Sequence, residues 1–176
     1  MSAASWRAFA AWALGDERAA LADIALALAD ARAIEQAASL MFALSHASLT
    51  LLHAGRRDQA RELIDELIAV AERAGTLYWK SYGLLLRGWL LHLAGDPAQS
   101  VQTLTAAIDA VRSTGATAYA PWYLSILAKA YADSGQPIDA RRCAAAAMAE
   151  MEATGEKWCE ADVRRRTDDI AKMMAG

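Results

Sequence analysis

The stretch Gly95 to Gly135, GDPAQSVQTLTAAIDAVRSTGATAYAPWYLSILAKAYADSG, carries turn signals that recur along the whole chain. One set of glycines and a second set halfway between them are evenly spaced: Gly15, Gly55, Gly95 and Gly135, then Gly75, Gly115 and Gly155. Seven of the ten glycines therefore lie on one lattice with a 20-residue spacing, which only Glu35 breaks. Self-similarity at a fixed period of about 40 residues is typical of a stacked repeat protein.

Length and composition fit this period. The 176 residues hold about four and a half such units. Alanine, the best helix former, is abundant, and only three prolines occur, so we expect an all-α chain of nine helices. The helices are predicted over residues 3–14, 16–34, 36–54, 57–74, 76–94, 96–114, from near 117, 137–154 and 157–174. They form one predicted domain, 1–176, with units at about 1–35, 36–75, 76–115 and 116–155 and a capping helix at 156–176.

Charge and hydropathy exclude several classes of partner. The 18 basic and 21 acidic side chains are mixed along the chain, and the net charge of −3 argues against nucleic acid. Arg87 and His92 interrupt the richest apolar stretch, so no run reaches the roughly 18 residues of a membrane helix. Cys143 and Cys159 fall at different heights of a predicted hairpin, which disfavours a disulfide and favours a cytoplasmic location.

The ends of the helices carry recognisable signals. Asp96-Pro97 is a strong start, because aspartate accepts from free backbone N–H groups and proline fits the first turn. Pro121 lies deeper, so that helix starts late or has an irregular first turn. The last helix carries the run Arg164 to Arg166, which we interpret as a solvated capping face in preference to an anion site.

At single positions the unit resembles the tetratricopeptide repeat, which has a small residue in its first helix, a glycine between helices and a small residue soon after. The corresponding positions here are Ala8, Ser48, Gly88 and Ala128, then the glycines of the first set, then Ala20, Ala60, Ser100 and Ala140. The period is 40 residues instead of about 34, and a glycine turn replaces the terminal proline of that family. The resemblance implies a right-handed α-solenoid of antiparallel helix pairs.

Residues 113 to 169 look more specifically like the C-terminal repeat region of bacterial adenylate and guanylate cyclases and of large LuxR-type regulators similar to the maltose-regulon activator. The motifs that carry this likeness are Thr114-Gly115-Ala116, Tyr123-Leu124, Gly135-Gln136 and Thr154-Gly155-Glu156. The likeness fades after Ala161. It implies a sensor or scaffold region in bacterial signalling, with no cofactor.

In the fold that the chain resembles, the first helix of each pair lines a concave groove. Carried over by position, the groove residues would be Phe42, Tyr82, Trp122, Trp89, Lys129, His92 and Ser125. The first three form an aromatic ladder suited to a peptide, a sugar or another flat apolar ligand. The alternative is that these aromatic residues pack between repeats as core. Trp79, Tyr119 and Trp158 are predicted to be packing anchors.

Two functions follow from these patterns. The first is a non-enzymatic interaction module that binds a protein, a peptide or a small ligand in its groove. The alternative is a scaffold or a homodimer that associates through an apolar first helix with Trp6, Phe9 and Trp12. Enzymatic activity and a metal site are not expected, because no acidic residue or cysteine lies at a ligand spacing beside His46 or His53.

Overall fold

The computed structural model describes residues 3–173, which form nine α-helices and no β-strand. This all-helical content confirms the predicted fold class, because consecutive helix pairs are the units of an α-solenoid. The chain divides into two compact units, Met1–Leu90 and Leu91–Gly176. A single domain over 1–176 stays a prediction.

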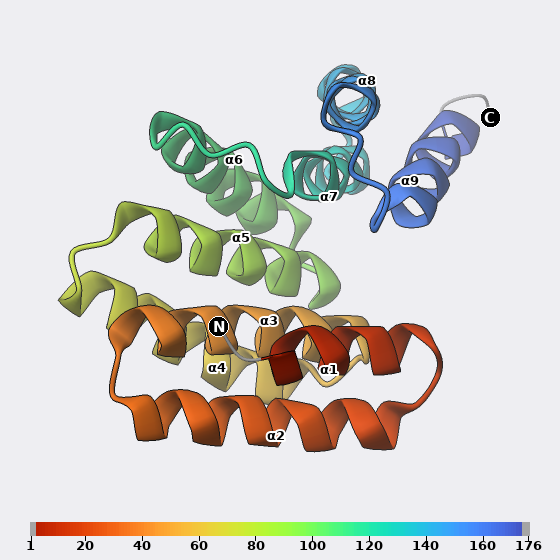
Figure 1. The fold of residues 1–176 in the computed structure, drawn as a ribbon. Helices are drawn as coiled ribbons and strands as arrows, with labels where there is room; N and C mark the ends of the chain where they lie inside the picture. Colours follow the sequence, from red (N-terminus) through yellow and green to blue (C-terminus); the bar gives the residue numbers. More distant parts are fainter. Residues whose placement is uncertain (1–2, 174–176) are drawn as a thin grey trace. The chain divides into compact units, whose positions relative to one another are not determined.

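The first unit is built around one nearly buried helix. Its helices are α1 (Ala3–Ala13), α2 (Glu17–Ile34), α3 (Ala37–His53), α4 (Arg57–Arg73) and most of α5 (Leu77–Leu93). Helix α3 packs against α1, α2 and α4, and Figure 1 shows α1 and α2 running side by side. Twelve of the 17 residues of α3 are buried. A helix covered on so many sides must be apolar or small all round, as α3 is.

The contact between α4 and α5 depends on Gly83. A Cβ atom at this position would lie 2.6 Å from Cγ1 of Ile68 and 3.4 Å from the side chain of Leu67. Glycine therefore lets the backbone of α5 approach the apolar face of α4 more closely than any other residue would.

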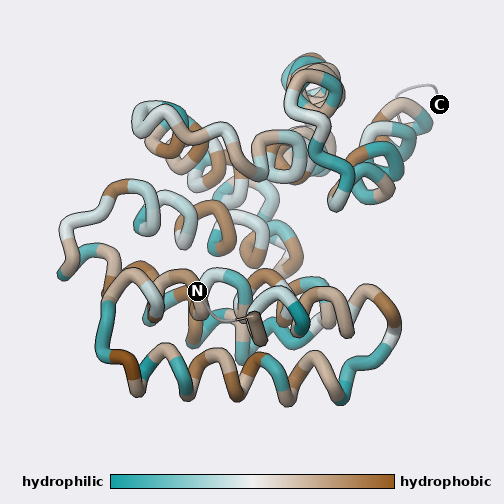
Figure 2. The backbone as a smooth tube through the Cα atoms, viewed as in Figure 1, coloured by the Kyte–Doolittle hydropathy of each residue, from teal (hydrophilic) through white to brown (hydrophobic). Residues whose placement is uncertain are grey.

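The second unit has the same plan around α7. Its helices are α6 (Pro97–Ser113), α7 (Ala120–Asp133), α8 (Pro137–Thr154) and α9 (Glu160–Met173). Helix α7 packs against α6, α8 and α9. In Figure 2 the tube of α9 carries a pronounced hydrophilic stretch, and only Val163 and Ile170 of this helix are buried.

The lattice glycines all have positive φ, between 64° and 87°, so they serve as left-handed turn residues. At the eighth lattice point Glu35 adopts the same conformation, with φ 56° and ψ 21°, and donates its N–H to the carbonyl of Arg32. A residue with a side chain is strained in this region by about 1 kcal/mol.

One helix starts at its predicted signal, and two helices start about three residues later than the predicted positions near 117 and at 157. The predicted start at Asp96-Pro97 is confirmed, because the Asp96 carboxylate accepts from the Gln99 N–H at 3.0 Å. Helix α7 starts at Ala120, directly before Pro121, and Tyr119 precedes it with φ 66°. Helix α9 starts at Glu160 instead of 157, which leaves Trp158 in the preceding turn.

Candidate functional site

The aromatic residues predicted to line a groove are mostly buried. The relative exposures are 9% for Phe42, 3% for Tyr82, 5% for Trp89 and 0% for Trp122. A side chain without exposed surface cannot stack on a ligand unless the fold opens. This placement favours the alternative interpretation, in which these residues are core. Lys129 and His92 are the partly accessible members of the set, with side chains that are 27% and 16% exposed.

In the first unit, Phe42 belongs to a cluster of rings. It stacks on His46 with 4.0 Å between ring centroids and meets Trp79 edge-on at 6.4 Å. Trp6 of α1 covers the other side, 6.0 Å from Phe42 and 4.7 Å from His46. The predicted role of Trp79 as a packing residue agrees with these contacts.

The aromatic stripe of α1 packs on α3. Phe9 and Trp12 lie 5.6 and 4.7 Å from the ring of His53, and Trp89 lies 4.8 Å from the same ring. Phe9 and Trp12 are half-buried, whereas Trp6 is 54% exposed. Of the three residues predicted to mediate self-association, Trp6 therefore presents the most surface.

His46 and His53 lie among the aromatic side chains that pack α1 on α3. Nδ1 of His46 is 3.0 Å from the carbonyl oxygen of Phe42 and 3.2 Å from Oγ of Ser45. Burial lowers the pKa of His46, and the hydrogen bond to the Phe42 carbonyl partly offsets this. Among residues 3–173, no group of three or more potential ligand side chains could hold a metal ion.

In the second unit, Trp122 is anchored from the turn before α9. The ring of Trp158 lies 6.1 Å from Trp122 and 5.5 Å from Tyr119. Glu156 holds this turn, since one carboxylate oxygen accepts from the Tyr119 N–H and the other from Nε1 of Trp158, both at 3.0 Å. These contacts agree with the predicted packing role of Tyr119 and Trp158.

A set of polar side chains, which we call the α7–α9 polar cluster, lies beside this core. Its members are His92, Ser125, Lys129, Asp133, Asp162 and Arg166. Nη1 of Arg166 donates to Oγ of Ser125 at 3.0 Å, and Ser125 donates to the carbonyl of Trp122 at 2.7 Å. Nη2 of Arg166 lies 3.6 Å from Asp162. Arg166 is therefore held by both α7 and α9.

The exposed part of the cluster carries both signs of charge. Lys129 forms an ion pair with Asp133 one turn further along α7, and Nε2 of His92 lies 3.6 Å from the same carboxylate. The side chains of Lys129, Asp133 and Asp162 are 27%, 29% and 29% exposed, whereas that of His92 is 16% exposed. Burial lowers the pKa of His92; Asp133 raises it, whereas Lys129 and the guanidinium of Arg166 lower it further. We therefore expect His92 to be neutral near pH 7.

The interpretation of Arg164 to Arg166 as one solvated face is wrong at Arg166. Arg164 and Arg165 are exposed and pair with Glu160 and Asp162, both at 2.8 Å. The Arg166 side chain, in contrast, is only 11% exposed. The signal was its spacing: Arg166 is three residues after the buried Val163 and four before Ile170, so it shares their face.

Comparison with known families agrees with the repeat pattern. The model of the tetratricopeptide repeat matches residues 41–66, 81–104 and 121–150, which begin in α3, α5 and α7 and run into the helix that follows. These three segments are therefore similar to tetratricopeptide repeats, a family that generally serves as non-enzymatic modules for protein–protein interaction. No curated protein matches the sequence.

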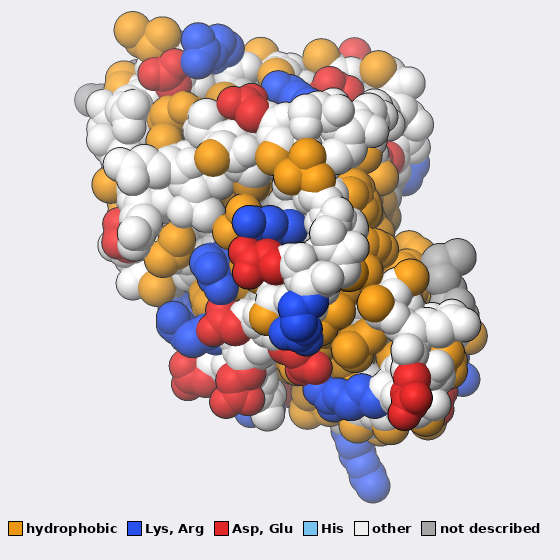
Figure 3. All heavy atoms as spheres, turned by 90° about the vertical axis from the view of Figure 1, so that its left-hand side faces the viewer, with side chains coloured by type: hydrophobic (Ala, Val, Ile, Leu, Met, Phe, Trp, Pro, Cys, Tyr) orange, Lys and Arg blue, Asp and Glu red, His pale blue; other side chains and the backbone are white. Residues whose placement is uncertain are grey.

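Two further observations bear on possible partners. On the face drawn in Figure 3, basic and acidic side chains are interspersed among hydrophobic ones, without a field of one sign. None of the helices over residues 3–173 is both long and apolar enough to span a lipid bilayer.

Cys143 and Cys159 are free and buried, and burial beside Glu156 raises the pKa of Cys159 to about 11.

Proposed function

We propose that this chain is a non-enzymatic interaction module and that it binds a protein or peptide partner through the α7–α9 polar cluster. The observation that carries the proposal is the partly exposed ion pair of Lys129 and Asp133 next to His92, in the same cluster as the hydrogen bond from Arg166 to the buried Ser125 that ties α9 to α7. A preorganised set of polar groups loses little side-chain entropy on binding. The three segments similar to tetratricopeptide repeats support this class of function.

The mixture of charges in the cluster suits a peptide. Lys129 offers N–H donors and Asp133 offers acceptors, which together match the alternating donors and acceptors of a peptide backbone or of polar side chains. The resemblance of residues 113 to 169 to repeat regions of bacterial signalling proteins supports a role in bacterial regulation. A small ligand stacked on the aromatic ladder is less well supported, because the ladder is buried.

Selection of peptides from a random library against the full chain tests this proposal. A selected peptide should bind Lys129→Glu at least about tenfold more weakly than the unaltered protein. Arg141→Gln is the matched control, because Arg141 is exposed on α8 outside the cluster. Circular dichroism must show that both variants keep their helix content. Equal weakening by the two variants, or none by Lys129→Glu, contradicts the proposed surface.

A second candidate is self-association through α1, which the exposure of Trp6 supports. A large exposed aromatic residue is typical of interface centres. Light scattering should then show a dimer that Trp6→Ser converts to a monomer. A protein that is monomeric at high concentration would contradict self-association, and Trp6 would then serve only to pack α1 on Phe42 and His46.

A further inference from the structure

The break in the glycine lattice coincides with a cavity of the first unit. Glu35 occupies the left-handed position that glycine fills at the seven other lattice points. An unfavourable conformation at one such point, where glycine is used everywhere else, suggests that its side chain has a use. Glu35 lines a cavity of about 390 Å³, a volume in the range of small-molecule sites.

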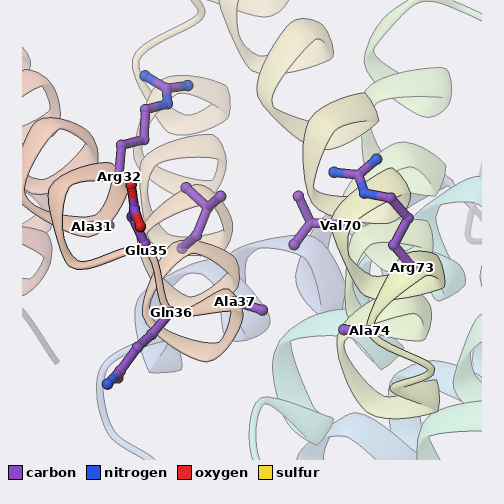
Figure 4. A pocket seen from close by; sticks show the side chains of 9 residues that line it. Ala31, Arg32, Glu35, Gln36, Ala37, Val70, Arg73 and Ala74 are labelled. Atoms are coloured by element: carbon purple, nitrogen blue, oxygen red, sulfur yellow. The ribbon is translucent and has the colours of Figure 1, made fainter.

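Three helix ends form this cavity. Its walls come from the end of α2, the start of α3 and the end of α4, and its apolar lining includes Leu40, Val70 and Ala74. Val70 is buried, Leu40 is half-buried and Ala74 is exposed. Figure 4 shows Glu35 beside Arg32 on one side, with Val70 and Arg73 across from them. The cavity therefore has an aliphatic lining between two walls that carry charge.

The charges on the two walls differ in their partners. Arg32 is engaged by Glu66, with 2.8 Å between Nη2 and Oε2. Within residues 3–173, by contrast, Glu35 and Arg73 are exposed and neither belongs to an ion pair or a side-chain hydrogen bond. One negative and one positive group, on opposite sides of an aliphatic lining, are thus available to a ligand.

We propose that this cavity binds a small zwitterion with an apolar body, of the class of a free amino acid with an aliphatic or aromatic side chain. Glu35 would accept from the ammonium group, Arg73 would bind the carboxylate, and the side chain would lie on Leu40 and Val70. Guanidinium and carboxylate groups match each other in geometry, and both groups of the ligand meet a complementary charge.

Isothermal titration of the full chain with three probes tests the charge requirement. L-Leucine carries both charges, leucinamide only the positive one and 4-methylpentanoate only the negative one. We expect L-leucine or L-phenylalanine to bind with a Kd below about 10 mM, and each singly charged leucine analogue to bind at least about tenfold more weakly. Failure of both amino acids to bind, or equal binding of the three leucine-like probes, overturns the proposal.

Variants separate binding from folding. Glu35→Gly should raise the Tm by about 2–4 °C, because it removes the strain at φ 56°, and should still weaken binding of the amino acid at least about tenfold. Arg73→Gln should weaken binding without this gain in Tm. Arg61→Gln and Glu62→Gln, exposed on α4 outside the cavity, are the controls. A Glu35→Gly protein that is more stable and binds as before shows that Glu35 has no role in a site.

Discussion

Helices α7 and α9 are the first helices of successive repeats in the second unit, yet they bury very different numbers of residues. Ten of the 14 residues of α7 are buried, whereas α9, of the same length, buries only Val163 and Ile170. Within the described residues of the second unit, α7 contacts α6, α8 and α9, whereas α9 contacts α7 and α8. Helix α9, which buries fewer residues than α7, leaves more polar side chains accessible. The candidate site therefore lies where the polar surface of α9 meets the buried α7.

The largest expected effect comes from the interior of α7. Trp122→Ala removes a fully buried indole and should lower the free energy of unfolding by about 3–5 kcal/mol, measured by urea denaturation. Trp158→Ala, which removes a ring that is 38% exposed, should have a clearly smaller effect. Equal losses of unfolding free energy in Trp122→Ala and Trp158→Ala would mean that Trp122 contributes no more to the core than the partly exposed Trp158 does.

The next effect distinguishes two neighbours on α9. Arg166→Ala leaves Oγ of Ser125 without its donor in a buried position and should destabilise the chain by about 1–3 kcal/mol. Arg165→Ala removes only an exposed pair with Asp162 and should change the stability by less than about 0.5 kcal/mol. Thermal unfolding of both variants measures the difference. Similar losses of stability in the two variants would mean that Arg166 belongs to the same solvated face as Arg165.

The pH dependence of stability should reflect two histidines. Burial lowers the folded-state pKa of both His46 and His92, so the unfolded state binds more protons near their ordinary pKa of about 6.5. Stability is therefore complete above that pKa and is lost as the pH falls through it towards the folded-state values. Urea denaturation between pH 8 and 5 should show this loss, and His92→Gln should reduce it. An unchanged profile in His92→Gln would mean that its surroundings do not disfavour the charged form.

The smallest effect is expected at the exposed part of the cluster. Lys129→Gln breaks an ion pair with Asp133 that is accessible to solvent, so the unfolding free energy should change by no more than about 0.5 kcal/mol. The same change should weaken a bound peptide. A loss of several kcal/mol in a denaturation experiment would make Lys129 part of the structural frame, together with Arg166.

Much of the fold could be predicted from the sequence, because helix ends depend on local chemistry. The glycines with positive φ and the Asp96 cap are determined by backbone sterics and by orphan N–H groups, which need no tertiary contact. The late start of α7 at Ala120 agrees with one of the two alternatives that Pro121 indicated, whereas the start of α9 at Glu160 instead of 157 was not predicted. The Tyr119 N–H bonds to Glu156, 37 residues away, and no local pattern reveals such a contact.

The candidate site was less predictable for the same reason. The 40-residue period indicates which positions are equivalent, but not whether Trp122 faces a groove or a neighbouring helix. In the run of three arginines, the spacing to Val163 and Ile170 could have placed Arg166 on their face, but its partner Ser125 on α7 could not be predicted from local sequence. Burial depends on which helices lie alongside, and this information is spread over the whole sequence.

The proposed binding surface is tested most directly by photo-crosslinking. A photoreactive amino acid is placed at Lys129, or at Arg141 as the control, and each full-length protein is irradiated with a peptide selected against the unaltered chain. We predict that the peptide crosslinks from position 129 and not from position 141. Crosslinking from position 141 alone, or equally from both positions, would contradict a partner-binding surface at the α7–α9 polar cluster.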